Sequence, residues 1–380
     1  MTESMLAQST AAPVDGSWTY REILQQPATL LDTQRGLEVD RARIEAFLSP
    51  LLAQPGLRVV LTGAGTSAFI GESLAPWLSN AMKRSVEAIS TTDIVSAPDL
   101  MLRADEPTLL VSFGRSGSSP ESKAAVELAD ARVASVHHLI ITCNPDGDLA
   151  GARGDNSCVV VLPEETHDRG FAMTSSFTAM TYAALAIFTG IATMAPRAER
   201  ISAGVADMLA RTEADVGLLA GRGFERVVYL GSGVFKGLSR EAALKLMELS
   251  DGAIVTAFDT PMGFRHGPKT IVTAETMVVV FVSNDPLTRR YDLDIVEELR
   301  ADGRAGAVLA IAARPVDGRS IVMQGMDGAD DVDLLFPYVV PAQMFGLKVS
   351  LALGLTPDRP NASGMVNRVV QGVRIHALNA

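Results

Sequence analysis

Three charged side chains share one face of a predicted helix in the stretch from Arg240 to Pro268. Glu241, Lys245 and Glu248 stand at positions i, i+4 and i+7, among residues that are mostly alanine, leucine and methionine. Burial raises the pKa of a carboxyl and a nearby ammonium lowers it, which makes a glutamate a usable base near neutral pH. We expect Glu248 to be this base. An ordinary Glu–Lys pair on a surface helix is the alternative.

A histidine follows this helix in a Gly-Phe-Arg-His-Gly-Pro loop. His266 stands between Arg265 and Gly267, and its unperturbed pKa near neutrality suits acid or base work on a sugar ring oxygen. A merely solvated loop histidine is the alternative. The remaining histidines show no metal-ligand spacing with each other or with acidic residues, so we expect no metal; they are His137, His138, His167 and His376.

Two hydroxyl-rich loops each follow a predicted strand. The first is Gly63 to Ser67 (GAGTS), and the second is Gly114 to Ser122 (GRSGSSPES), which precedes a helix whose dipole favours an anion. At adjacent strands these loops would converge at one sheet edge and form a phosphate cradle. A helix cap with a flexible lead-in is the alternative for the second loop. Because GAGTSAF lacks the third glycine of a dinucleotide motif, we expect no nicotinamide cofactor. We expect no cofactor of another kind either.

The elements that position these residues alternate between strand and helix. Buried strands are expected at 58–61, 108–112, 138–143 and 158–162, with helices between them. This alternation predicts a doubly wound α/β fold with sites at the carboxyl ends of the strands. Before the first strand, residues 18–53 show helical spacing interrupted at Pro27, which indicates two or three helices in an arm or cap.

The strand pattern occurs twice. RVVLTGAG begins at Arg58 and RVVYLGSG at Arg226, while TLLVSF begins at Thr108 and TMVVVF at Thr276, an offset of 168 residues in both cases (226 − 58 and 276 − 108). Such a constant offset indicates an internal duplication. We therefore predict an arm over residues 1–53 and two domains, 54–200 with the phosphate loop and 201–380 with the charged helix and His266.

Composition limits the classes of partner. A chain of 380 residues with 47% hydrophobic and 20% charged residues is typical of a globular protein with two cores, and its net charge of −11 disfavours nucleic acid and anionic membranes. Cys143 and Cys158 form no disulfide or zinc pattern, which favours a reducing compartment. The N-terminus has no targeting pattern and the apolar runs are too short to span a bilayer. We expect a cytoplasmic protein.

These motifs resemble those of the sugar isomerase (SIS) fold. GTS at 65–67, GRSGSS at 114–119, ExxLKLxE at 241–248 and HGP at 266–268 are similar to its signature positions, in the double-domain arrangement of the isomerase half of glucosamine-6-phosphate synthase. SFGRSGSSPES with FDTPMGFRHGPKT resembles the AgaS family more closely. Its members are described as tagatose-6-phosphate ketose/aldose isomerases or galactosamine-6-phosphate deaminases. The resemblance implies two tandem SIS domains, each a doubly wound, mainly parallel sheet flanked by helices.

The resemblance also implies roles for residues. Glu248 would move a proton between C1 and C2 of the sugar, Glu241 and Lys245 would line the site, and His266 would open the ring. The HGP loop of the enzymes that this chain resembles serves the neighbouring subunit, and the segment after Glu248 is long enough to leave its own domain, so we expect a dimer with shared sites. Substrate contacts are expected from Gly65, Thr66, Ser67, Arg115, Ser116, Gly117, Ser118 and Ser119, and from Ala172, Met173 and Thr174.

One departure from the synthases narrows the reaction. The tail DRPNASGMVNRVV lacks the lysine that forms an imine with a keto sugar, and the chain shows no glutaminase domain, so amino-sugar synthesis is not expected. The expected reaction is conversion of galactosamine 6-phosphate to tagatose 6-phosphate and ammonia. Glucosamine-6-phosphate deamination, plain tagatose-6-phosphate isomerisation and a sugar-phosphate-binding regulator without turnover are the alternatives.

Overall fold

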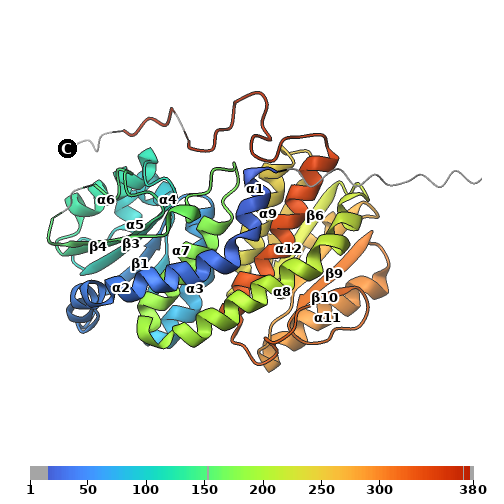
Figure 1. Ribbon diagram of the computed structural model, residues 1–380, viewed down its shortest axis with the longest axis horizontal. Helices are drawn as coiled ribbons and strands as arrows, with labels where there is room; N and C mark the ends of the chain where they lie inside the picture. The colour runs from blue at the N-terminus through green and yellow to red at the C-terminus, as the bar shows by residue number, and fades with distance from the viewer. Residues whose placement is uncertain (1–15, 152–153, 371, 377–380) are drawn as a thin grey trace, which may run out of the picture.

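Two five-stranded parallel sheets form the two halves of the chain (Figure 1). The structure is a computed structural model that describes residues 16–151, 154–370 and 372–376. The first sheet has the order β2-β1-β3-β4-β5 and the second the order β10-β9-β8-β6-β7. Their bounds are β1 Arg58–Thr62, β2 Val86–Ala88, β3 Thr108–Gly114, β4 Val136–Thr142, β5 Ser157–Val161, β6 Arg226–Gly231, β7 Val255–Asp259, β8 Thr276–Phe281, β9 Ala307–Ala312 and β10 Ser320–Val322.

The strand registers repeat between the halves. Arg58 pairs with Thr108 in the first sheet, and Arg226 pairs with Thr276 in the second. These are the residues related by the 168-residue offset, so the two sheets have equivalent strands in equivalent places. The predicted doubly wound fold in tandem copies is confirmed.

Helices cover both faces of each sheet. The longer ones are α2 Gln26–Leu52, α3 Thr66–Met82, α6 Pro120–Arg132, α7 Ser175–Thr189, α8 Ala195–Ala220, α9 Phe235–Leu249, α11 Pro286–Asp302 and α12 Asp331–Ala352. The shorter ones are α1 Trp18–Leu24, α4 Thr91–Ser96, α5 Pro98–Met101 and α10 Pro261–Phe264, with 3₁₀ turns at Glu164–Thr166, Ile191–Thr193 and Pro268–Ile271.

One apolar core joins the two halves. Successive side chains of a strand point to opposite faces, so Val59 and Leu61 of β1 face the joint core while Val60 faces an outer cluster under α6. Val227 and Tyr229 of β6 face the same joint core from the other sheet. The inner faces of the sheets therefore face each other across the helices between them, and the site on the first half lies within reach of α9 from the second.

The N-terminal helices belong to this joint core. Ile23, Leu30 and Leu37 are at most 2% exposed, and α2 packs against α7 and α8 while α1 packs against α12. The predicted arm is therefore a covering layer over its own chain (Figure 1). The boundary that we propose between the two domains, at residues 200 and 201, lies inside α8, which packs against both α2 and α12.

The central helix α12 is long and strongly apolar. Among the described residues it is a helix long and apolar enough, by length and composition, to cross a membrane, but 89% of that apolar window is buried inside the protein. Its contacts with α8 and α9 account for that composition. A core helix buried on all sides requires apolar residues around its whole circumference.

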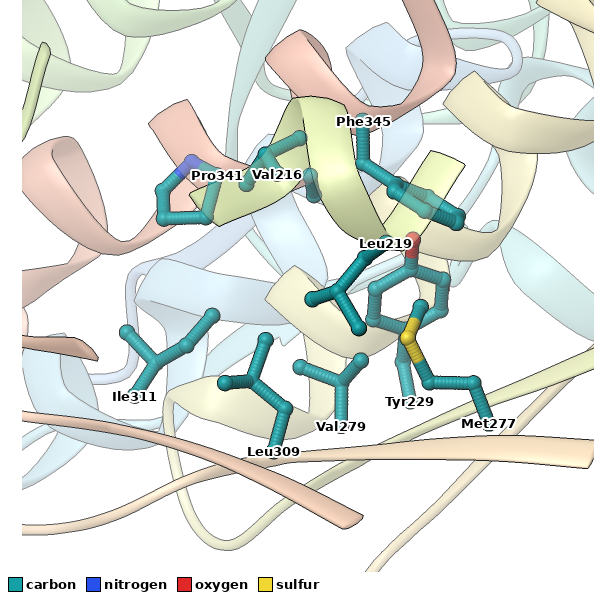
Figure 2. A pocket seen from close by; sticks show the side chains of 10 residues that line it. Val216, Leu219, Tyr229, Met277, Val279, Leu309, Ile311, Pro341 and Phe345 are labelled. Carbon is teal, nitrogen blue, oxygen red and sulfur yellow. The ribbon is translucent and has the colours of Figure 1, made fainter. Parts of the chain in front are cut away.

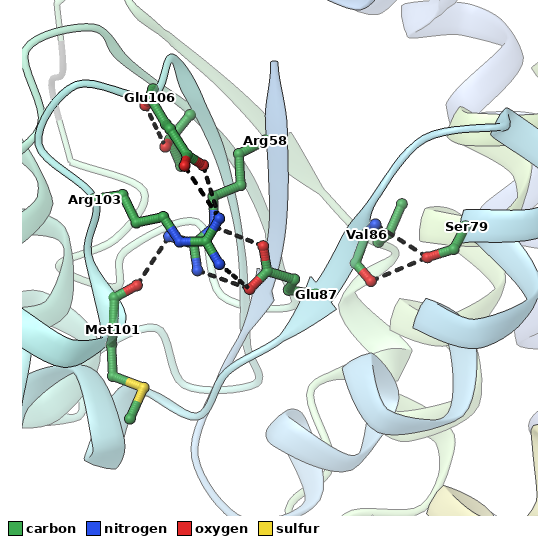
Figure 3. A network of polar contacts seen from close by, with 8 residues as sticks. Arg58, Ser79, Val86, Glu87, Met101, Arg103 and Glu106 are labelled. Carbon is green, nitrogen blue, oxygen red and sulfur yellow. Dashed lines mark hydrogen bonds and ion pairs between the residues drawn. The ribbon is translucent and has the colours of Figure 1, made fainter. Parts of the chain in front are cut away.

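A polar network connects the edge strand β2 to β1 (Figure 3). It lies at the end of the sheet opposite the two hydroxyl-rich loops. Arg58 Nε and Nη2 donate to Glu87 at 2.7 and 2.8 Å, and Arg58 Nη1 donates to the Met101 carbonyl at 2.8 Å. The Arg58 guanidinium lowers the pKa of Glu87. This bidentate pair supports the fold at the amino ends of the strands.

The second half contains a small apolar cavity between its sheet and helices α8 and α12 (Figure 2). It measures about 10 Å³, and the Tyr229 hydroxyl at its wall has no hydrogen-bond partner in the described part of the chain. Val279 and Leu309 come from the sheet side and Phe345 from α12. The cavity has room for about one water molecule, so it belongs to the packing of the core.

Candidate active site

A cavity of about 110 Å³ opens where β1 and β3 end, at the point where the strand order of the first sheet reverses. Open α/β sheets bind ligands at this position. Residues from the loops after β1 and β3, from the loop before α7 and from the C-terminal segment line it, namely Ala64, Ser67, Phe113, Gly114, Arg115, Ser116, Gly117, Ser119, Ser122, Met173, Arg368, Val369 and Val370.

Glycines set the shape of the two hydroxyl-rich loops. Gly65 has φ 55° and is the N-cap of α3, and Gly117 has φ 65° next to the Thr142 hydroxyl. Only glycine adopts such positive φ values without strain. Ser119 caps α6 by accepting from the Ser122 N–H at 3.2 Å, so its hydroxyl both caps a helix and lines the cavity. The cavity wall thus combines hydroxyls, backbone and a helix N-terminus, a composition suited to an anion.

Arg115 holds two other segments against this loop. Its Nη1 donates to the Phe171 carbonyl at 3.2 Å and its Nη2 to the Arg368 carbonyl at 2.8 Å. Burial, followed by repulsion from Arg368, lowers the pKa of Arg115. Arg115, which we predicted as a phosphate ligand, therefore lines the cavity. It also holds the loop before α7 and the C-terminal segment in place by hydrogen bonds.

Asp168 orders the loop that leads into α7. Its fully buried carboxylate accepts from the backbone N–H groups of Thr174 and Ser176 at 2.7 and 2.9 Å, and from the hydroxyls of Ser175 and Ser176. A carboxylate at this position satisfies the free N–H groups of the helix and matches its dipole. Thr174 is therefore engaged in capping α7.

Glu22 from the N-terminal helix α1 supports the same loop from behind. It is 3% exposed and accepts from the backbone N–H groups of Arg169 and Gly170. Burial and the charge of Asp168 raise the pKa of Glu22 to about 7. Glu22 and Asp168 thus both hold this loop in place, and Met173 of the loop lines the cavity.

The three charged residues predicted to share a face of helix α9 are buried to different degrees. Glu241 is fully buried, Lys245 is 1% exposed and the Glu248 side chain is 25% exposed. Lys245 Nζ lies 2.6 Å from Glu248 and 3.5 Å from Glu241. Burial opposes the positive charge of Lys245, but the attraction of the two carboxylates raises its pKa overall.

The desolvated carboxyl of this helix is Glu241. Burial raises the pKa of Glu241 to about 7, and the ammonium of Lys245 opposes that rise. The Thr66 hydroxyl is buried beside this carboxyl without completing a hydrogen bond of ordinary geometry. Our expectation of an apolar environment around a carboxyl of this helix thus applies to Glu241. Glu248 is partly exposed and is not among the residues that line the cavity.

The helix of the second half and the loop of the first half act on each other electrostatically. The charge of Glu248 favours the charged form of Arg115, while the charge of Arg115 disfavours that of Lys245. Helices α3 and α9 also pack together. The structure therefore brings a glutamate held by a lysine next to a cavity suited to an anion, although the two come from different halves.

The segment between Glu248 and His266 does not leave its own domain. Residues 255–259 form β7, the edge strand beside β6, because the backbone pairs with the neighbouring strand from Arg226 to Leu230. Our expectation of a departing loop is wrong for this stretch. His266 itself follows α10, is exposed and does not line the cavity.

The cavity gathers about half of the predicted substrate-contacting residues. These are Ser67, Arg115, Ser116, Gly117, Ser119 and Met173. Gly65 lines a neighbouring polar pocket with Arg240, and Thr66 points to Glu241. Ser118 is exposed, with its hydroxyl accepting from the Asp148 N–H at 3.2 Å, and Ala172 is fully buried.

Sequence reasoning missed two residues of the cavity that carry chemistry. Ser122 belongs to the GRSGSSPES loop, where its helical position concealed its place in the wall. Arg368 stands in the tail that lacks the imine-forming lysine, and the arginine in NRVV was the signal for its place in the cavity wall. In the described ranges, no group of three or more His, Cys, Asp or Glu side chains could hold a metal ion.

A duplicated α/β unit with an anion cavity at its switch point defines a class, that of the SIS-domain proteins. Residues 51–190 match the SIS domain model. An AgaS protein of Streptomyces coelicolor is 48% identical over 377 residues, which cover 97% of this chain and 98% of the relative. The D-galactosamine-6-phosphate deaminase AgaS of Escherichia coli is 46% identical over 378 residues, with the same coverage of both chains.

A solved structure agrees with these relatives. The crystal structure of tagatose-6-phosphate ketose/aldose isomerase from Escherichia coli has a TM-score of 0.88 and 43% identity, covering 96% of this chain and 98% of that one. The chain belongs to the AgaS family of SIS-domain enzymes.

Proposed function

We propose that the protein deaminates galactosamine 6-phosphate and isomerises it to tagatose 6-phosphate. The observation that carries the proposal is the Glu248–Lys245 pair at 2.6 Å, electrostatically coupled to Arg115 of the anion cavity. A positioned base beside a phosphate site is what proton transfer on a sugar phosphate requires. The names of the E. coli relatives supply the substrate class.

The phosphate would bind in the cavity at the ends of β1 and β3. Ser67, Ser116 and Ser119 offer hydroxyls, and the N-terminus of α6 offers a favourable dipole. With the phosphate held there, the carbon chain of the open sugar extends toward α9. Glu248 then removes the proton from C2, and the electron pair moves toward the C1 carbonyl to give an enolamine.

The second half of the reaction returns a proton and releases ammonia. The protonated Glu248 delivers its proton to C1, which gives an imine at C2. Water adds to this imine, the C2–N bond breaks, and ammonia leaves with formation of the C2 ketone. Lys245 Nζ, 2.6 Å from Glu248, would hold this carboxyl in position through the reaction.

We further propose that the enzyme works as a dimer in the cytoplasm. His266 is exposed beside β7, whose residues Val255 and Phe258 are exposed apolar side chains on an edge strand. An apolar edge of this kind favours a subunit contact. His266 would thereby reach the partner's cavity and protonate or deprotonate the ring oxygen. Two free buried cysteines are consistent with a reducing compartment.

The proposal is tested by incubating the purified protein with galactosamine, glucosamine and tagatose 6-phosphates while ammonia and ketose are both assayed. We expect ammonia and tagatose 6-phosphate in equal amounts from galactosamine 6-phosphate, and a lower rate with the C4 epimer. Ammonia from glucosamine 6-phosphate alone would overturn the choice of sugar.

Plain isomerisation is the second candidate, supported by the similarity to the E. coli tagatose-6-phosphate ketose/aldose isomerase. The same base would move the same proton on a sugar whose C2 carries a hydroxyl. Equilibration of tagatose 6-phosphate with an aldose, without ammonia release from either amino sugar, would establish this reaction and exclude deamination.

A further inference from the structure

The C-terminal segment from Asn361 to Val370 crosses from the second half to the first and closes one side of the cavity (Figure 1). At its start, Asn361 Nδ2 donates to Asp251 just after α9 at 2.7 Å. At its far end, Arg368, Val369 and Val370 line the cavity. The segment thus links the helix that carries Glu248 to the hydroxyl-rich loops.

Arg368 makes one hydrogen bond through its side chain and another through its backbone carbonyl. Its Nη2 donates to the Asp168 carbonyl, and its own carbonyl accepts from Arg115 Nη2 at 2.8 Å. Its Nε is buried and has no hydrogen-bond partner among the residues that the structure describes. The Asp168 carboxylate is occupied by the N-terminus of α7, so it does not pair with Arg368 directly.

Two guanidinium groups therefore share one cavity wall without an ion pair in the described part of the chain. Arg115 is 5% exposed, and repulsion from Arg368 adds to its burial in disfavouring its charge. A buried charge without a partner is unfavourable, and an anion placed between the two groups would relieve both the repulsion and the lost hydration. Arg368 lines the cavity, and its Nε–H has no partner among the described residues, so the side chain keeps a free donor for such an anion.

We infer that the guanidinium of Arg368 binds the substrate phosphate directly, while Arg115 holds the tail and the 168–174 loop in place around it. The C-terminal segment is then part of the substrate site and supplies its second cation. The inference rests on the proposed function in taking a phosphate ester as the ligand. It adds a residue to the expected phosphate ligands, which are Thr66, Ser67, Arg115, Ser116 and Ser119.

The test uses inorganic phosphate as the probe and titration calorimetry of the full-length protein as the measurement. Arg368→Gln removes the charge and should weaken phosphate binding by about tenfold or more, the effect of losing one charge-assisted hydrogen bond. Arg368→Lys keeps the charge and should recover most of the affinity. Arg374→Gln is the matched control, because Arg374 is exposed in the same tail and does not line the cavity.

A purely structural role for Arg368 makes a different prediction. Both substitutions would then weaken phosphate equally, and the amides of residues 361–370 would lose protection from hydrogen exchange even without phosphate. That result, or unchanged affinity in Arg368→Gln, would overturn the inference. Phosphate binds without being turned over, so a failure to release ammonia would count against the proposed function and leave this result standing.

Discussion

Two carboxylates on one helix differ here because their burial differs. Glu241 is fully buried and burial raises its pKa to about 7, whereas Glu248 is partly exposed and makes the shorter contact with Lys245. A base must reach its substrate, so we assign proton transfer to Glu248. We assign to Glu241 the task of keeping the Lys245 ammonium in place.

Glu241→Gln should change how stability depends on pH. The folded-state pKa of about 7 lies above the ordinary 4.5, so the contribution of the neutral carboxyl is fully present below pH 4.5 and is lost as pH rises through about 7. The variant lacks this loss. Its free energy of unfolding relative to wild type should therefore rise by about 3 kcal/mol across that range, measured by urea unfolding at several pH values.

The exposed Glu297 on α11 provides the control for this prediction. Glu297→Gln should leave the pH dependence of unfolding as in the wild type. If the difference between Glu241→Gln and wild type stays constant from acid to neutral pH, Glu241 is not a desolvated carboxyl and its assigned role fails.

At the scale of elements, helix α1 and the 168–174 loop form one support for the cavity. Glu22 accepts from two backbone N–H groups of the loop, and Gly170 packs so closely that an added Cβ would lie 2.7 Å from Thr19 Oγ1 and 2.8 Å from Glu22 Oε2. The loop therefore depends on a helix that begins about 150 residues earlier in the chain.

Gly170→Ala should separate this helix from the loop. Because the Thr19 backbone also lies 3.2 Å from the added carbon, we expect a loss of about 1–3 kcal/mol in the free energy of unfolding and a higher KM for the sugar phosphate. Gly36→Ala is the matched control. Gly36 is exposed within α2 with open space around it, so alanine there should stabilise by about 0.5–1 kcal/mol. If Gly170→Ala and Gly36→Ala change the free energy of unfolding equally, Gly170 is not closely packed against α1.

The strands and the first half of the site were predictable because their signals are local. Apolar runs repeated at a fixed offset identified both sheets, and helical spacing identified Glu241, Lys245 and Glu248 as neighbours. The place of Arg368 was not predictable in this way, because Arg115 lies 253 residues away and the tail has no periodic pattern. The pairing of β7 was missed because a short edge strand resembles a loop in sequence.

At the scale of the whole molecule, the proposed dimer divides the site between subunits. We expect Glu248→Gln and His266→Ala to be nearly inactive separately, and a mixture that exchanges subunits to regain activity. One of the two sites in a hybrid dimer would be wild type at both positions. Activity should be followed as ammonia release, with subunit exchange verified independently. Exchange without recovered activity would place His266 in the site of its own chain.

The most direct test of the central claim follows the C2 hydrogen of galactosamine 6-phosphate by proton NMR. The wild type should remove this hydrogen while ammonium and tagatose 6-phosphate appear in equal amounts. Glu248→Gln, which keeps the shape but lacks the base, should slow that loss by about 10²–10⁴ with little change in binding. Wild-type rates of C2 hydrogen loss in Glu248→Gln would contradict the assignment of Glu248 as the base.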